Sequence, residues 1–328
     1  MGDVALSLPF IYEAAKEYPQ TSFCVVTTPL HAQLLTPLLP NIKVIPYDIR
    51  QQGSVWGAIR MAFSLHKQWR EADVIDLHDV LRTRLIRALL SALGHRIYTL
   101  KKPRRQRQRL LQRQPTAVVA PSNYVTPMTQ VYSRAFQLAG LTKVQQGWSP
   151  WLQQPKQQSL VIGVAPYAKH KAKVLPTQHL KKLLHLLHEA FPNYQIRLYG
   201  GGASERHANA ALAKEAPQYL TCSNAPSLAK ELEEIAQLAV MLSMDSANQH
   251  LAAWVGTPVV SIWGATHPAA GFLPWNGELQ NCIGMDLPCR PCSVYGQKPC
   301  LRGDYLCLNN LNLTLIIQAV KKLLPHHS

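Results

Sequence analysis

Short apolar segments alternate with longer amphipathic segments in the first half of the chain. The short segments are rich in β-branched residues and carry few charges, which is typical of buried strands. The longer ones repeat their apolar residues at helical spacing, as LRTRLIRALLSAL does at 81–93. Strands that alternate with helices predict an α/β domain with a parallel, doubly wound sheet. The expected strands are FCVVT (23–27), KVIPY (43–47), DVIDLHD (73–79), RIYTL (96–100) and AVVAPS (117–122).

The same alternation begins again after residues 143–158, a stretch rich in Gln and Pro that has no apolar run. Such a stretch is typical of a linker between domains. We therefore predict two Rossmann-like domains, residues 1–150 and 151–328, and regard the C-terminal helix as a candidate to pack back on the first domain. In the second domain we expect strands entering loops at 159–166, 195–202, 239–246 and 257–268, and helices at 179–191, 248–256 and 312–327.

The composition fits a folded protein with an anionic partner. Of the 328 residues 47% are hydrophobic, which excludes wholesale disorder. No window approaches the roughly 18 apolar residues of a membrane-spanning helix. The whole chain contains seven cysteines, which is too few for a disulfide-framed secreted domain. We expect a cytosolic protein with mostly reduced thiols. The formal net charge of +16 indicates nucleic acid, acidic lipid, a nucleotide or a phosphorylated glycan as the partner.

The segment MDSANQHLAAWVGTPVVSIWGATHP, residues 244–268, carries a candidate anion site. An expected strand ends at Asp245 and Ser246, two good helix N-caps, so the following helix directs its free amides and positive dipole end out of the carboxyl edge of the sheet. Diphosphates bind at such places. His250, one turn further on, and the loop that contains Thr266 lie beside it. The alternative is structural: Asp245 and Ser246 cap the helix, and His250 is a core histidine.

This segment resembles the donor-site signature of glycosyltransferase family 9, the ADP-heptose:lipopolysaccharide heptosyltransferases. Further segments resemble family motifs in the family's order: Gly2-Asp3-Val4, Asp76-Leu77-His78-Asp79 with Arg82, Lys173-Val174-Leu175-Pro176, and Tyr199-Gly200-Gly201-Gly202 with Glu205. The resemblance spans nearly the whole chain. It implies the GT-B fold, two Rossmann-like domains facing a cleft, with the acceptor on the N-terminal domain and the nucleotide-sugar on the C-terminal domain.

The resemblance implies an inverting sugar transfer that needs no metal or other cofactor, with ADP-heptose as the donor by family default. Asp3 matches the base that deprotonates the acceptor hydroxyl; a helix N-cap is the alternative role. Lys173 matches the lysine that neutralises the leaving diphosphate, and Lys169 is close enough in sequence to assist unless it belongs to a solvated loop. Glu205 matches an acid for the ribose hydroxyls, with a helix-terminal acid as the alternative. The remaining expected donor contacts are Asp245, Ser246, His250 and Thr266.

The run KKPRRQRQRLLQRQ at 101–114 is strongly basic. It has no interleaved aromatic residues and no recognisable nucleic-acid module, so nucleic acid is not the expected partner. A solvated basic loop is one interpretation. Because the resemblance places the acceptor on the first domain, the other is contact of Arg104, Arg105 and Arg107, together with Arg82, with an anionic acceptor or an acidic membrane face. A phosphorylated lipopolysaccharide precursor at the cytoplasmic face of the inner membrane fits both demands.

The first sheet has an expected gap. Family members have a β-strand before the Gly-Asp motif, whereas here Met1 stands inside that motif. We therefore expect the first strand of this sheet to be missing, which leaves two neighbouring strands without a ladder partner. We hypothesise that the true start lies upstream of Met1.

The cysteines at 289, 292, 300 and 307 lie in a stretch rich in loop residues. Cys289 and Cys292 have the spacing of a zinc knuckle, but Cys300 and Cys307 do not. Structural zinc, packed thiols and a redox-labile disulfide are the alternatives, and we assign no metal ligands.

Two rival functions follow from the same residues. The missing strand is compatible with a non-catalytic relative that binds nucleotide-sugars without transferring them. The Arg-rich run is compatible with an RNA- or DNA-binding protein, which would bind with strong salt dependence.

Overall fold

The computed structural model describes residues 1–48, 54–112, 118–155 and 159–324. By contacts the chain divides into two compact units. Unit 1 comprises Met1, residues 3–102 and residues 128–150, and unit 2 comprises Gly2, residues 103–127 and residues 151–328. The last division along the chain, between Pro150 and Trp151, lies within the expected linker, whereas residues 103–127, placed with the first domain by sequence, group with unit 2.

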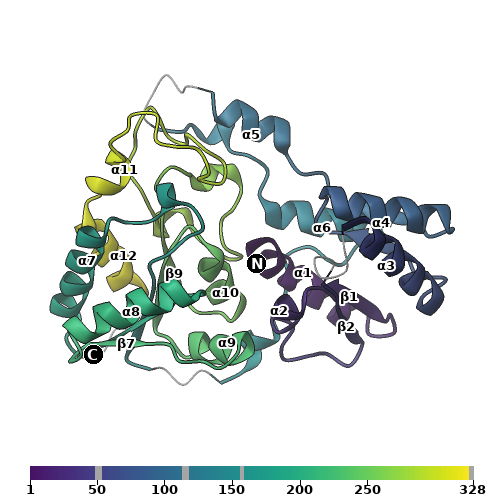
Figure 1. Ribbon diagram of the computed structural model, residues 1–328, viewed down its shortest axis with the longest axis horizontal. Coiled ribbons are helices and arrows are strands. Elements are labelled where there is room, and N and C mark those ends of the chain that lie inside the picture. Colours follow the sequence, from purple (N-terminus) through teal and green to yellow (C-terminus); the bar gives the residue numbers. More distant parts are fainter. Residues whose placement is uncertain (49–53, 113–117, 156–158, 325–328) are drawn as a thin grey trace. The chain divides into compact units, whose positions relative to one another are not determined.

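Unit 1 contains two separate two-stranded parallel sheets, β1 with β2 and β3 with β4. In its described part no strand joins the two pairs, which is the arrangement expected when the first strand is missing. The strands and helices keep the expected alternation (Figure 1). They are α1 (Gly2–Glu17), β1 (Phe23–Thr27), α2 (Pro29–Ala32), β2 (Ile42–Pro46), α3 (Ser54–Gln68), β3 (Val74–Asp76), α4 (Leu81–Ala92), β4 (Ile97–Thr99) and α6 (Met128–Leu138).

Helix α1 is buried on nearly all sides, including Leu8 at 0% and Tyr12 at 0% exposed. A helix that is apolar all round forms part of a core rather than a surface. The Glu13 carboxylate of this helix is used structurally, because it accepts the backbone N–H groups of Gln145 at 2.9 Å and Gly147 at 2.8 Å. These bonds tie α1 to the segment that leads out of unit 1.

Unit 2 is built on a six-stranded, fully parallel sheet with the order β10-β9-β8-β5-β6-β7. The first strand of the unit, β5, pairs with β6 on one side and with β8 on the other, so the winding reverses between β5 and β8. Its strands are β5 (Val161–Ala165), β6 (Gln195–Leu198), β7 (Leu220–Cys222), β8 (Val240–Met244), β9 (Val259–Ile262) and β10 (Cys282–Ile283). Its α-helices are α5 (Arg104–Leu110), α7 (Thr177–Ala190), α8 (Ala203–Glu215), α9 (Leu228–Ala236), α10 (Ala247–Trp254), α11 (Leu306–Asn309) and α12 (Leu313–Leu323). Short 3-10 turns are η1 (Pro121–Asn123), η2 (Pro150–Gln153, at the crossing between the units), η3 (Lys171–Lys173), η4 (Pro268–Ala270) and η5 (Leu279–Asn281).

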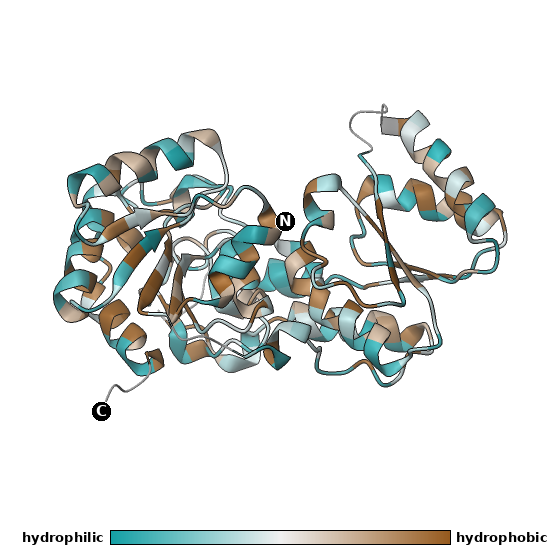
Figure 2. Cartoon of the chain, turned by 90° about the horizontal axis from the view of Figure 1, so that it is seen from below, coloured by the Kyte–Doolittle hydropathy of each residue, from teal (hydrophilic) through white to brown (hydrophobic). Residues whose placement is uncertain are grey.

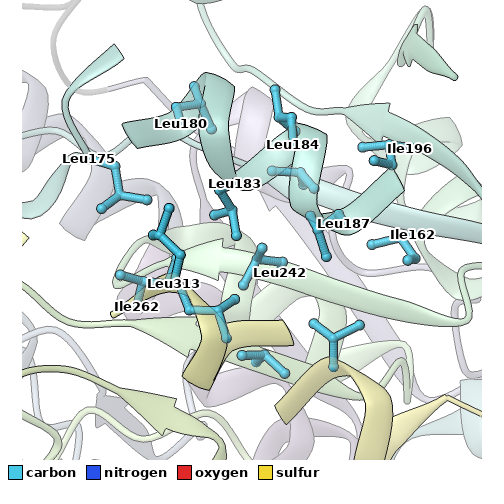
Figure 3. Packing of buried hydrophobic residues seen from close by; sticks show 14 of the residues in the cluster. Ile162, Leu175, Leu180, Leu183, Leu184, Leu187, Ile196, Leu242, Ile262 and Leu313 are labelled. Atoms are coloured by element: carbon cyan, nitrogen blue, oxygen red, sulfur yellow. The ribbon is translucent and has the colours of Figure 1, made fainter. Parts of the chain in front are cut away.

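The core of unit 2 lies between the sheet and helices α7 and α12. The apolar stripe of α7 faces Ile162, Ile196 and Leu242 of the strands, as Figure 3 shows. The stripe consists of Leu180, Leu183, Leu184 and Leu187, which are at most 5% exposed. In Figure 2 the strands of this sheet are mostly brown, whereas the helices alternate brown and teal along their length. The C-terminal helix α12 contacts α7, β8 and β9 of its own unit.

Residues 103–112 and 118–127 fold against the loop after β9. Leu110, Val119 and Val125 form a small apolar cluster with Ala269 and Ala270, and the Val125 N–H donates to Ala269 O at 2.8 Å. The expected strand AVVAPS does not form in its described residues, because 118–120 are irregular and 121–122 belong to the turn η1. Val119 is buried by packing onto this loop instead of pairing in a sheet, so an apolar β-branched segment was misassigned from its composition.

Candidate functional site

The reversal between β5 and β8 creates the place where ligands bind in open α/β sheets. The segments that leave the carboxyl ends of these two strands carry Lys173 and Asp245. The Lys173 Nζ lies 2.9 Å from the Asp245 Oδ2, and the two side chains are 13% and 8% exposed. The structure therefore brings two of the expected site residues together as a nearly buried ion pair.

Asp245 is held by three groups. Besides Lys173, its Oδ2 accepts the Thr266 hydroxyl at 2.7 Å, and its Oδ1 accepts the Gln249 Nε2 at 2.9 Å. Thr266 is 0% exposed, so its hydroxyl is committed to Asp245 rather than presented at a surface. Asp245 thus connects the turn η3, the start of α10 and the loop after β9.

Ser246 occupies the N-cap position of α10 with an extended backbone, φ −144° and ψ −177°. Its side chain makes no cap hydrogen bond to the helix, and its Oγ instead lies 3.3 Å from the Oγ of Ser243. The first amides of α10 are left uncapped by this side chain, and the helix dipole adds positive potential there. His250, on the next turn, is 7% exposed and belongs to the interior of the unit.

The loop after β9 is fixed from the opposite side by Arg290, which is 4% exposed. The guanidinium donates to the carbonyl oxygens of Trp263 at 2.9 Å, Gly264 at 2.5 Å and Thr266 at 3.0 Å. The Ala265 N–H donates in turn to Ala172 O at 2.9 Å, next to Lys173. One buried side chain thereby sets the path of the loop that carries Thr266.

Glu205 lies in the first turn of α8, directly after the glycines that follow β6. Its Oε2 accepts the Gly201 N–H at 2.7 Å. Its charge also helps to raise the pKa of Tyr167, for which burial is the larger cause. Tyr167 follows β5 and Glu205 follows β6, so both lie past the carboxyl edge of the sheet. Lys169 is exposed on the same loop as Tyr167.

In unit 1, Asp3 lies in the first turn of α1 with a side chain that is 42% exposed. The Nζ of Lys102, a side chain only 12% exposed, lies 3.5 Å from the Asp3 Oδ2. The charges of Asp3 and Lys102 both affect the pKa of His78. Its pKa is lowered, first by burial and also by Lys102, while Asp3 and Asp76 act in the opposite direction. The lowered pKa favours the neutral imidazole of His78.

The motif after β3 forms a compact charged network. The Asp76 Oδ1 accepts the N–H groups of His78 at 2.9 Å and Asp79 at 3.0 Å, and Asp79 has a left-handed backbone with φ 48°. Arg84 donates to both carboxylate oxygens of Asp79, and Arg87 lies 3.2 Å from the Asp76 Oδ2. Arg82, the residue proposed for the acceptor, is exposed on the second position of α4.

The structure separates the three arginines of the basic run that we expected to contact an acceptor or a membrane. Arg104 and Arg105 are exposed in the first turn of α5. Arg107 is 4% exposed, donates to Ala270 O at 3.2 Å and lies 4.3 Å over the Phe272 ring. Its role is to attach α5 to the loop after β9, so it does not contribute to a surface for an acceptor or a membrane.

The cysteines at 289, 292, 300 and 307 line one small cavity together with Arg290 and Tyr305. All are free thiols. Burial raises the pKa of Cys307 to about 11 and also raises that of Cys292, which favours the neutral thiol. Across the described ranges, no three or more His, Cys, Asp or Glu side chains are arranged to hold a metal ion.

Several residues of these sites were not found from the sequence. Gln249 of α10 stands four residues after Asp245, a spacing at which the two side chains can meet, but no motif marks it. Lys102 and Arg290 are distant in sequence from the groups they hold, and no local pattern links them. Gly296 is also distant in sequence from the residue it contacts. Its backbone is left-handed, with φ 80°, and lies against the aliphatic part of the Lys173 side chain.

Known proteins with a similar sequence belong to one family of enzymes. The family described as glycosyltransferase family 9 (heptosyltransferase) matches residues 63–300. The lipopolysaccharide heptosyltransferase 1 of Pseudomonas aeruginosa is 26% identical over 325 residues, which cover 89% of this chain and 83% of that protein.

Two solved structures are similar over nearly their whole length. The E. coli heptosyltransferase WaaC with ADP-2-deoxy-2-fluoro heptose has a TM-score of 0.66 at 20% identity and covers 98% of this chain and 96% of its own. A family 9 glycosyltransferase from Veillonella parvula has a TM-score of 0.69 at 15% identity and covers 98% and 93%. The expected GT-B fold is thereby confirmed. Within the part of the chain that is described, no helix is both long enough and apolar enough to cross a membrane.

Proposed function

The chain belongs to glycosyltransferase family 9, the heptosyltransferase family, and we propose that it transfers a heptose from ADP-heptose to a lipopolysaccharide precursor, with inversion and without a metal. The observation that carries the proposal is the Lys173–Asp245 pair at the point where the sheet of unit 2 reverses. Relatives support the choice of donor and acceptor, since one is named a lipopolysaccharide heptosyltransferase and another was solved with an ADP-heptose analogue.

Lys173 is suited to neutralise the diphosphate that leaves. A lysine ammonium has three N–H donors, and one contact with Asp245 leaves donors for phosphate oxygens. Asp245, Thr266 and Gly296 fix the side chain before the donor arrives. A preorganised cation stabilises charge that grows on the leaving group at little reorganisation cost. The uncapped amides at the start of α10 would add to this stabilisation.

The remaining proposed donor contacts lie in segments that leave the carboxyl edge of the sheet of unit 2. Glu205 would accept hydrogen bonds from the ribose hydroxyls through its carboxylate, whose Oε2 is already oriented by Gly201. Lys169 is exposed on the loop after β5 and would approach the phosphates from solvent. Ser246 would donate its hydroxyl to a phosphate oxygen. Asp245, Thr266 and His250 would act as the support of this pocket, because their side chains are buried.

The base would be Asp3 of unit 1. The Asp3 carboxylate is partly exposed, so an acceptor hydroxyl can reach it, and Lys102 holds one of its oxygens. His78, whose lowered pKa favours the neutral imidazole, and the exposed Arg82 belong to the motif that follows β3 and would contact the acceptor. Since the acceptor is a membrane lipid, we propose that the enzyme works at the cytoplasmic face of the inner membrane as a peripheral protein.

The experiment is a thermal-shift panel followed by a transfer assay. ADP and ADP-heptose should raise the melting temperature of the protein, because a ligand that binds only the folded state stabilises it by mass action. UDP- and GDP-sugars should give smaller shifts. No shift with any nucleotide-sugar would reject the proposal.

The transfer assay uses a heptose-deficient lipopolysaccharide precursor with EDTA present, and mass spectrometry detects the product. The Asp3→Asn variant should keep the shift with ADP-heptose and lose transfer by at least about a hundredfold, the usual contribution of a general base. Full transfer by this variant would remove Asp3 from the mechanism. Donor binding without transfer by the wild type would identify a non-catalytic relative.

A further inference from the structure

Helix α3 of unit 1 presents an aromatic and basic face to solvent. Trp56, Arg60, Phe63 and Lys67 follow each other at helical spacing, so they share one side of the helix. Trp56 is 71% and Phe63 is 53% exposed, and Arg60 and Lys67 are exposed as well. We call these four residues the α3 face.

The opposite side of α3 is anchored in unit 1. Ala58, Met61 and Ala62 are at most 6% exposed and pack with Ile86 and Leu90 of α4. Figure 1 shows α3 and α4 side by side. Other residues of α3 already form its core-facing stripe, so Trp56 and Phe63 are not needed to pack the helix in unit 1.

The chemistry of the α3 face matches an anionic lipid surface. Tryptophan is enriched where a membrane meets water, because its ring is apolar and its N–H is polar. Basic residues between the aromatic ones are typical of helices that lie in the plane of such an interface. The sequence of α3, SVWGAIRMAFSLHKQ, has no acidic residue that would oppose contact with lipid phosphates.

A second copy of the chain is a poorer occupant. A two-fold contact places each residue of the face near the same face of the partner. The α3 face carries two cations and no anion, so two copies would bring like charges together. Lipid phosphates supply the complementary charge.

We infer that the α3 face docks on an anionic bilayer, with Trp56 and Phe63 at the level of the headgroups and Arg60 and Lys67 next to lipid phosphates. The inference rests on the proposed function only in that the acceptor is a membrane lipid. It assigns a membrane contact to unit 1, on a face other than the basic run in which Arg107 is buried.

The test measures co-sedimentation of the full chain with vesicles, without nucleotide-sugar. Vesicles contain phosphatidylethanolamine with phosphatidylglycerol, and neutral phosphatidylcholine vesicles serve as the comparison. We expect the wild type to bind the anionic vesicles more tightly than the neutral ones, and we expect this difference in affinity to shrink as the salt concentration rises. The double variant Arg60→Glu with Lys67→Glu should weaken binding by at least about tenfold, since each basic residue near such a surface is worth about 1 kcal/mol. The double variant Trp56→Ala with Phe63→Ala should weaken it at all salt concentrations.

Matched controls lie on unit 2. Lys321→Glu with Lys322→Glu changes the net charge by the same amount, at exposed positions on α12. Leu279→Ala with Leu315→Ala removes exposed apolar side chains that are 45% and 44% exposed. Both controls should bind vesicles like the wild type.

Each outcome decides something. Equal binding by the α3-face variants and their controls overturns the inference, and so does a wild type that ignores anionic vesicles. A self-associated wild type that becomes monomeric in Arg60→Glu with Lys67→Glu assigns the face to a second copy and also overturns it. The shift of the melting temperature with ADP-heptose is measured on the same samples. If that shift persists while vesicle binding is absent, only this inference fails; if vesicles bind and the shift is absent, the proposed function fails instead.

Discussion

Replacing Lys173 by methionine tests the centre of the candidate donor site. The change removes the ammonium that lies 2.9 Å from the Asp245 Oδ2 while keeping a long, flexible side chain beside Gly296. Asp245 then remains as a carboxylate that is 8% exposed. Breaking a buried pair in this way generally costs about 3–5 kcal/mol, because a charge is left without its counter-charge.

The surroundings of Asp245 reduce this cost. Thr266 and Gln249 still donate hydrogen bonds to the carboxylate at 2.7 and 2.9 Å. We therefore expect Lys173→Met to lower the free energy of unfolding by about 2–3 kcal/mol, near the value of one hydrogen bond to a charged group. For a unit of this size that corresponds to a fall in melting temperature of roughly 4–12 °C. Affinity for ADP should fall in the same variant.

The assay is a double-mutant cycle with Asp245→Asn, read by urea unfolding and by the shift with ADP. The Lys173→Met/Asp245→Asn protein should be more stable than the sum of the single changes predicts, by roughly 1–3 kcal/mol. Lys169→Met, on the exposed loop nearby, is the control and should change stability by less than about 0.5 kcal/mol. Additive effects, or a Lys173→Met protein as stable as the wild type, would refute the reasoning that the two side chains form one unit.

Two further predictions concern groups outside the donor site. Arg107→Met should lower the free energy of unfolding by about 1.5–3 kcal/mol, because the guanidinium bonded to Ala270 O is buried, while Arg105→Met should leave it unchanged; equal denaturation midpoints would contradict this. Burial, with the charge of Glu234, raises the pKa of Glu231 to about 7. The folded chain then holds a proton that the unfolded chain releases, so this group lowers stability as pH rises from about 4.5 to 7. Glu231→Gln should therefore raise the melting temperature at pH 8 and have no such effect near pH 4, and a pH-independent gain would disprove the assignment.

The centre of the parallel sheet of unit 2 could be predicted from the sequence because β5, β8 and β9 are mostly apolar runs that end in a loop. β5, β8 and β9 lie where their patterns indicate, and the α7 stripe is buried as its spacing requires. The short strands β7 and β10 were missed, since three and two residues are too few for a pattern.

The candidate site could be predicted only in part. Local motifs identified Lys173, Asp245 and Thr266, but not that Thr266 serves Asp245 rather than a ligand. Charge patterning grouped Arg107 with Arg105, although burial separates them. Contacts of this kind join segments that are distant along the chain, and they exist only once the sheet has formed.

Arg290 gives the loop after β9 an unusual dependence on a remote part of the sequence. The loop is distant in sequence from the arginine that donates hydrogen bonds to its carbonyl oxygens, and the segment around β10 lies between them. If the loop after β9 is replaced by that of a relative without the relative's own distal segment, these hydrogen bonds from the arginine are lost. We therefore expect chimaeras with recombination points between residues 266 and 290 to have a disordered loop after β9, whereas exchange of both stretches together should keep its path.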